Sequence, residues 1–197
     1  RRAVPDGCVG PMTRNMGFKT VWVACLGLLL VATPAWAKTK IATIFGDNMV
    51  LQRDRPVPVW GWSDPGDEIT VIFAGQTKTA SAGTGGAWRV TLNRMSASAE
   101  PRAMIIRSKA ENQESKIENV VVGEVWFCSG QSNMGLALSD CYRAPEEIAA
   151  AHYPGFRFFV APGSGAPVPA ADLAGGKWQV CAPETAASFA GTAYFFG

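Results

Sequence analysis

A serine follows a long apolar run in the stretch GEVWFCSGQSNM, residues 123–134. Residues 120–127 are almost continuously apolar, which is typical of a strand covered on both faces in an α/β sheet. Gly130 would allow a sharp turn after this strand, so Ser132 would stand where the next helix begins. Reactive groups in α/β sheets lie at the carboxyl ends of strands. The position therefore predicts that the Ser132 hydroxyl is a nucleophile for acyl transfer.

Acyl transfer at Ser132 also requires an oxyanion site and a base. Backbone N–H groups at the start of the next helix would point outward, where they can stabilise a negative oxygen. The only histidine, His152, falls between a predicted helix end and the next strand, so we interpret it as a surface residue near the helix C-terminus rather than as the base. The alternative role for Ser132 is that of an ordinary helix cap.

The elements predicted after residue 119 alternate between strand and helix. A helix begins near Pro145, because proline is favoured in the first turn and two acidic residues follow it. Residues 156–160 are predicted to form the next strand, and residues 188–196 have aromatic and small residues at helical spacing. This order predicts that residues 120–197 are the first, truncated part of a flavodoxin-like α/β domain.

Residues 38–119 are predicted to form a separate all-β domain. Apolar residues alternate with polar ones in several short stretches, and turn signals rich in Gly, Pro and Asp separate them. Short strands at regular spacing predict a small β-sandwich. Trp60, Trp62 and Trp88 could form a flat platform for sugar rings, and the alternative is that they fill the core.

Residues 1–37 are predicted to be a leader with a signal peptide. A start at Met16 is followed by a lysine, by an apolar stretch too short to span a bilayer comfortably, and by small residues before a cleavage site after Ala37. The alternative is an uncleaved membrane anchor. Export predicts a periplasmic or secreted protein.

Residues 38–197 carry 14 of the 18 basic and 15 of the 16 acidic residues, a net charge of −1, so nucleic acid is not an expected partner.

Three cysteines remain after the predicted cleavage: Cys128, Cys141 and Cys181. An odd number allows one disulfide and one free thiol in an oxidising compartment, and the sequence leaves the pairing open. Their spacing resembles no zinc site, and a single histidine gives little support for a metal centre. No metal or cofactor is expected.

The stretch around Ser132 resembles the first sequence block of the SGNH hydrolases, in the form found in sialate O-acetylesterases and related carbohydrate acetylesterases. The stretches IFGDNMVLQRDRPVPVWGWSDPGDEITVIFAGQTKTASAGTGGAWRVTL and GGKWQVCAPETAASFAGTAYFFG resemble further parts of the same family, in the same order. The resemblance covers nearly all of residues 41–197. It implies that Ser132 is the nucleophile and that its backbone N–H is one oxyanion donor.

The resemblance also implies what this chain lacks. The family's catalytic Asp and His would lie beyond Gly197, and its other oxyanion donors, a Gly and an Asn, have no match here. The expected reaction is cofactor-independent removal of O-acetyl groups from sugars, with sialic acid favoured and acetylated xylan as the competitor. The piece of 197 residues is expected to be inactive and poorly soluble alone. Two alternatives are a sugar-binding module with a degenerate hydrolase remnant and a purely structural β-domain.

Overall fold

Period-two alternation of buried and exposed side chains determines the strands in the first part of the chain. The computed structural model describes residues 39–163 and 168–197. In β6 (Ala87–Leu92), every second side chain from Trp88 onward is buried, and those between are exposed. β3 (Val57–Trp62) alternates in the same way between buried and half-buried side chains. The prediction that this part is rich in β-structure is confirmed.

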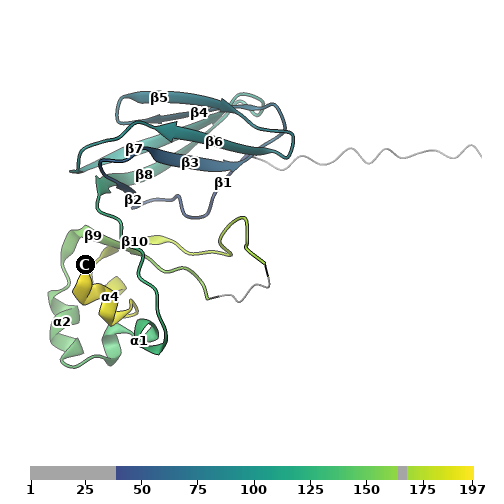
Figure 1. The fold of residues 1–197 in the computed structure, drawn as a ribbon. Coiled ribbons are helices and arrows are strands. Elements are labelled where there is room, and N and C mark those ends of the chain that lie inside the picture. Colours follow the sequence, from purple (N-terminus) through teal and green to yellow (C-terminus); the bar gives the residue numbers. More distant parts are fainter. Residues whose placement is uncertain (1–38, 164–167) are drawn as a thin grey trace, which may run out of the picture. The chain divides into compact units, whose positions relative to one another are not determined.

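Eight described strands precede residue 124, and they form two sheets (Figure 1). The bounds of those not yet given are β1 (Lys40–Ile41), β2 (Val50–Gln52), β4 (Glu68–Phe73), β5 (Gln76–Ser81), β7 (Ser98–Ser108) and β8 (Gln113–Gly123). One sheet has the order β1-β3-β6 and the other β2-β8-β7-β4-β5. All pairs are antiparallel except β2 with β8, which is parallel.

The inward faces of these two sheets contribute to one hydrophobic core. Its largest fully buried members come from both sheets: Met49, Val59, Ile69, Val71, Phe73, Leu92, Met104, Ile106 and Val120. Burial of one large apolar side chain stabilises the fold by roughly 1.5–3 kcal/mol. This core is therefore the main source of stability for the first part of the chain.

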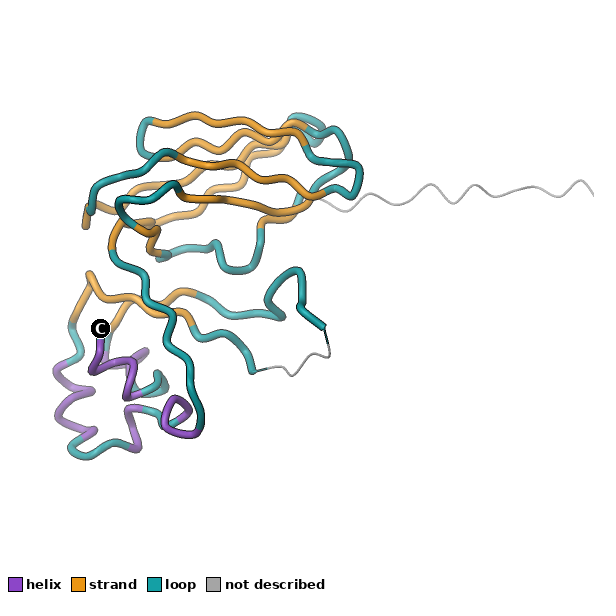
Figure 2. The backbone as a smooth tube through the Cα atoms, in the orientation of Figure 1, coloured by secondary structure: helices purple, strands orange, loops and turns teal. Residues whose placement is uncertain are grey.

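The predicted buried strand over residues 120–127 is only partly correct. Its first half, up to Gly123, is the end of β8, where three consecutive valines are buried and the last two, Val121 and Val122, pair with β2. Residues 124–130 have no regular structure (Figure 2). In this segment Trp126 is 65% exposed and Phe127 is 93% exposed. The physical reason is that β2 ends at Gln52, so no described strand continues beside this segment.

The rest of the chain contains short helices and one small sheet. The bounds are α1 (Ser132–Gly135), a 3-10 turn η1 (Leu138–Asp140), α2 (Ala144–Ala150), β9 (Tyr153–Phe159), β10 (Trp178–Cys181), α3 (Pro183–Ala186) and α4 (Gly191–Phe196). The predicted helix near Pro145 is confirmed by α2, which has its two glutamates in the first turn. The predicted strand over residues 156–160 is confirmed by β9, except at its last residue.

A parallel α/β sheet is not confirmed in the described residues after 123. β9 pairs with β10, and the pair is antiparallel. A second hydrophobic cluster joins these strands to the helices: Leu138, Ala151, Phe158, Cys181, Ala186 and Tyr194, with Cys141, Ile148, Phe156 and Phe189 packed against it. Phe158 and Phe189 stack with ring centroids 4.2 Å apart, which connects β9 to the segment before α4.

Within residues 39–163 and 168–197, no helix is long and apolar enough to cross a membrane. The predicted leader and signal peptide, residues 1–37, lie outside the described residues.

Candidate active site

Ser132 is the first residue of α1, and its side chain is exposed. Gln131 before it is the N-cap residue, and no side chain caps the helix through a hydrogen bond. Ser132 therefore does not act as the helix cap, and its hydroxyl group is accessible. The first N–H groups of a helix have no acceptor within the helix, so the start of α1 also provides free backbone donors beside the hydroxyl.

Gly130 has a different role from the predicted one. Its φ is outside the left-handed region, so the chain makes no glycine-specific turn there. A Cβ atom at Gly130 would instead lie 2.7 Å from Cγ of Met134. Gly130 therefore leaves room for the Met134 side chain, which a larger residue at this position would displace.

The segment around Ser132 is held by the segment that leads into α4. Leu138 N–H donates to Phe189 O at 2.8 Å, and Gly191 N–H donates to Leu136 O at 2.9 Å. Closer to the serine, Thr192 Oγ1 donates to Asn133 O at 3.2 Å. These bonds join segments more than fifty residues apart, so α1 depends on α4 for its position.

Gly191 makes the contact between these two segments possible. A Cβ atom at this position would clash with Sγ of Cys141 and lie 3.8 Å from Ala137 O. Gly191 itself is buried. The chain therefore requires the smallest residue where α4 begins against the segment after Ser132.

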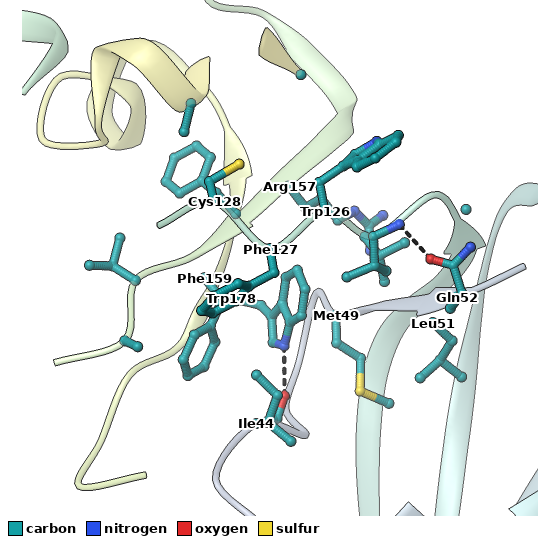
Figure 3. A pocket seen from close by; sticks show the side chains of 18 of the residues that line it. Ile44, Met49, Leu51, Gln52, Trp126, Phe127, Cys128, Arg157, Phe159 and Trp178 are labelled. Atoms are coloured by element: carbon teal, nitrogen blue, oxygen red, sulfur yellow. Dashed lines mark hydrogen bonds between the residues drawn. The ribbon is translucent and has the colours of Figure 1, made fainter. Parts of the chain in front are cut away.

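A wide cleft of about 2080 Å³ lies beside the segment that leads to Ser132 (Figure 3). Aromatic side chains provide much of its wall, among them Trp126, Phe127, Phe159 and Trp178. Residues on either side of Ser132 line the cleft, but Ser132 itself does not. Ligand sites in proteins are commonly concave and largely apolar with a few polar groups, and this cleft has that character.

Two hydrogen bonds fix the wall of the cleft, and both are drawn in Figure 3. Val125 N–H donates to Oε1 of Gln52 at 2.9 Å. Trp178 Nε1–H donates to Ile44 O at 2.7 Å. The first bond holds the start of residues 124–130 against β2, and the second holds β10 against the loop after β1.

Arg157 is a buried cation in the wall of the cleft, only 9% exposed. Its Nη1 donates to the carbonyl oxygens of Asn48, at 3.2 Å, and of Asn119, and its Nη2 donates to Oδ1 of Asn119 at 2.9 Å. Desolvation by burial lowers the pKa of Arg157. Its partners are neutral oxygens rather than a carboxylate, so it ties β9 to the turn at Asn48 and to Asn119 in β8.

Asp172 ties another loop to the first part of the chain. Its carboxylate accepts hydrogen bonds from Lys40 Nζ at 2.6 Å and from the N–H and Oγ1 of Thr43, both at 2.9 Å. Burial alone would raise the pKa of Asp172, but the hydrogen bonds from Lys40 and Thr43 outweigh burial and lower it to about 2. Asp172 is therefore ionised at neutral pH.

Sequence reasoning did not single out Arg157 or Asp172. Each is the only charged residue in an apolar or small-residue stretch, and a lone charge in such a stretch is a usable signal. The partners are 132 and 129 positions away for Asp172 and 109 and 38 positions away for Arg157, which the sequence does not reveal.

His152 lies just after α2 and before β9, and it is exposed. The structure thus agrees with its interpretation as a residue at a helix end. Among the described residues, no side chain forms a hydrogen bond with the Ser132 hydroxyl, so the structure assigns no base to it.

The three cysteines Cys128, Cys141 and Cys181 are all unpaired in the structure. Cys128 is exposed, whereas burial raises the pKa of the Cys181 thiol. In the part of the chain that the structure describes, no three His, Cys, Asp or Glu side chains gather in a way that would hold a metal ion.

Comparison with curated proteins finds relatives that are all sialate O-acetylesterases. The sialate O-acetylesterase of Mus musculus is 28% identical over 146 residues, which cover 70% of this chain and 27% of that protein. The sialate O-acetylesterase of Homo sapiens is 28% identical over 118 residues, which cover 56% of this chain and 23% of that protein. The chain thus spans about a quarter of the length of these relatives. No family model matches the chain.

Comparison with solved structures finds a carbohydrate acetylesterase from Xanthomonas citri. The TM-score is 0.77 and the sequence identity is 36%, over 81% of this chain and 36% of that one. The structural similarity and the sequence similarity therefore lead to the same group of enzymes.

Proposed function

We propose, from the similarity of this chain to sialate O-acetylesterases, that its protein is a serine esterase of that family that removes O-acetyl groups from sialic acid. The similarity to a carbohydrate acetylesterase over 81% of the chain is the observation that carries this proposal. The exposed serine at the start of α1 supports it locally, because a nucleophile must be accessible and must have oxyanion donors nearby.

The proposed reaction proceeds in two steps through an acetyl-enzyme. Oγ of Ser132 attacks the acetyl carbonyl carbon, and a base takes the hydroxyl proton. The carbonyl electron pair moves onto oxygen, where the backbone N–H of Ser132 stabilises it. The intermediate then collapses, the bond to the sugar oxygen breaks, and the proton passes to that oxygen.

The second step repeats this chemistry with water. Water attacks the acetyl-enzyme, acetate leaves, and Ser132 regains its proton. The resemblance noted from the sequence assigns the base and its orienting acid to His and Asp beyond Gly197. We therefore assign to this chain the nucleophile, one oxyanion donor and the cleft beside them, and no metal or cofactor.

The choice of sialic acid rests on the curated relatives, which are sialate O-acetylesterases. The structural neighbour is a carbohydrate acetylesterase, without a named sugar. Acetylated xylan is therefore the substrate against which sialic acid must be compared.

We also propose that the protein is exported and that it is divided close to the predicted boundary at residue 119, where β8 ends at Gly123. Export rests on the predicted signal peptide with cleavage after Ala37, and sequencing of the mature N-terminus tests it.

The division rests on the two hydrophobic clusters, because buried members of the first end at Val122 and those of the second begin at Leu138. The β-rich part and the later part would then be separate folding units.

Acetate release tests the proposed function. The protein, extended to its natural stop codon, is assayed with O-acetylated sialic acid and with acetylated xylan. We expect release from sialic acid, and its loss in Ser132→Ala but not in Ser139→Ala, a second exposed serine seven residues later. Equal activity in Ser132→Ala would contradict the proposed nucleophile. Release from xylan alone would contradict the proposed sugar.

A further inference from the structure

The outward face of the sheet β1-β3-β6 carries two tryptophans, two positions apart in β3. In β3, Val57, Val59 and Gly61 are buried, and Trp60 and Trp62 between them are half-buried. They therefore point away from the core. Because they are two positions apart in one strand, their side chains lie about 7 Å apart along the face. This spacing is comparable to that of neighbouring rings in a sugar chain.

Trp88 does not belong to this face. It is 2% exposed and is a member of the hydrophobic core. Its partner across the strands is Gly61, and a Cβ atom at Gly61 would lie 2.7 Å from Cζ2 of Trp88. Gly61 thus makes room for the buried indole beneath the face. The three tryptophans singled out in the sequence separate into one core residue and two surface residues.

Contacts from neighbouring elements hold the two outward indoles in place. Phe45 packs perpendicular to Trp60, with ring centroids 4.7 Å apart. Nζ of Lys40 lies 5.3 Å from the ring centroid of Trp62. A pre-positioned aromatic ring loses little conformational freedom when a ligand stacks on it. A shallow, open depression of about 490 Å³ lies on this face, and both indoles line it.

The charge on this face is positive. Arg89 of β6 is directly opposite Trp60 in the register, so both side chains lie on the same side of the sheet. Arg89 is exposed and lines the hollow, and no described carboxylate forms an ion pair with it. The charge of Lys40 is already matched by Asp172 at 2.6 Å. Arg89 is therefore the available cation beside two flat apolar rings.

We propose that this face, defined by Trp60, Trp62 and Arg89, binds a sugar chain that carries carboxylate groups. The apolar faces of pyranose rings stack on the indoles, and the guanidinium of Arg89 binds a carboxylate through charge-assisted hydrogen bonds. The choice of a sugar as ligand rests on the proposed function. The binding itself requires no ester bond and no nucleophile, so the face acts as a second site that retains the glycan while the esterase works.

Titration calorimetry tests this proposal without any esterase activity. The protein extended to its natural stop codon and carrying Ser132→Ala is titrated with a trimer of α2,8-linked N-acetylneuraminic acid that has no O-acetyl groups, and in parallel with neutral xylotriose. We expect the acidic trimer to bind, and to bind at least tenfold more tightly than xylotriose. Failure of the acidic trimer to bind, or equal binding of both sugars, would overturn the proposal.

Two substitutions locate the binding. Trp62→Ala is expected to abolish it, and Arg89→Gln is expected to weaken it at least tenfold, and to make it less sensitive to salt, because one ionic contact is removed. Arg89 is exposed and is not expected to be needed for folding, so this variant keeps the test decisive if Trp62→Ala does not fold.

Matched controls come from elsewhere in the chain. Arg94→Gln removes an exposed arginine just after β6, and Trp126→Ala removes an exposed tryptophan in the wall of the large cleft. Neither is expected to change the affinity for the trimer. Loss of binding with Trp126→Ala and unchanged binding with Arg89→Gln and Trp62→Ala would place the sugar in the large cleft and overturn the proposal. These outcomes are independent of acetate release, which tests the esterase separately.

Discussion

Asp172 provides the sharpest test of how the later part of the chain is held to β1. Its side chain is only 14% exposed and forms an ion pair with Lys40. The pKa of Asp172 falls from an ordinary value of 3.8 to about 2 in the folded protein. Since one pKa unit corresponds to about 1.4 kcal/mol, the ionised carboxylate stabilises the fold by about 2.5 kcal/mol. Asp172→Asn is expected to lower the free energy of unfolding by that amount at pH 7.

The pH dependence of this effect has a definite sign. A carboxylate whose folded pKa is lowered stabilises the protein fully above its unfolded pKa, and this contribution is lost as the pH falls through the folded value. The difference between wild type and Asp172→Asn should therefore be constant from pH 7 to pH 5, decline below about pH 4, and vanish only below about pH 2.

Urea unfolding at pH 7, 5, 3.5 and 2.5 measures this difference. Asp54→Asn is the matched control, because that carboxylate is 58% exposed and its pair with Arg53 is expected to contribute less than about 1 kcal/mol. If Asp172→Asn were as stable as wild type at pH 7, or if its deficit did not change with pH, the assigned role of the ionised carboxylate would be refuted.

Two further substitutions test the core of the first part. Gly61→Ala is expected to destabilise the protein by about 1–3 kcal/mol in urea unfolding, because the new methyl group would overlap Lys40 O and Trp88. Gly46→Ala is its control, since no atom lies within 4 Å of a Cβ there, and a comparable loss in this control would argue against the packing explanation. Met104→Ala removes a side chain with no exposed surface, and a loss of about 2–5 kcal/mol is expected; a loss below about 1 kcal/mol would contradict its place in the core.

The sequence predicted the strands best where local alternation decides the structure. The alternation around Trp88 requires only that one side of a strand be buried, and the structure agrees. In β3 the same alternation places Trp60 and Trp62 on the face of the sheet that points away from the core. The sequence could not assign the three tryptophans, because the inward side of β3 depends on its pairing with β6.

The apolar run before Ser132 shows that composition alone does not predict which residues are buried. Residues 120–127 are apolar or small except for Glu124. Burial nevertheless stops after Val122, because β2, the neighbour of β8, ends at Gln52. An apolar run indicates that a segment can be covered, and the covering partner is set by contacts distant in sequence. The carboxylate of Asp172 and the guanidinium of Arg157 escaped prediction for the same reason.

Covalent labelling tests most directly whether Ser132 is the nucleophile. The protein extended to its natural stop codon is treated with a fluorophosphonate, which reacts with activated serine hydroxyls, and the modified peptide is identified by mass spectrometry. Ser129→Ala is the control, because it changes an exposed serine in the segment that leads to α1. We expect a single adduct on Ser132, retained in Ser129→Ala and lost in Ser132→Ala together with acetate release. An active enzyme labelled at another serine would contradict it.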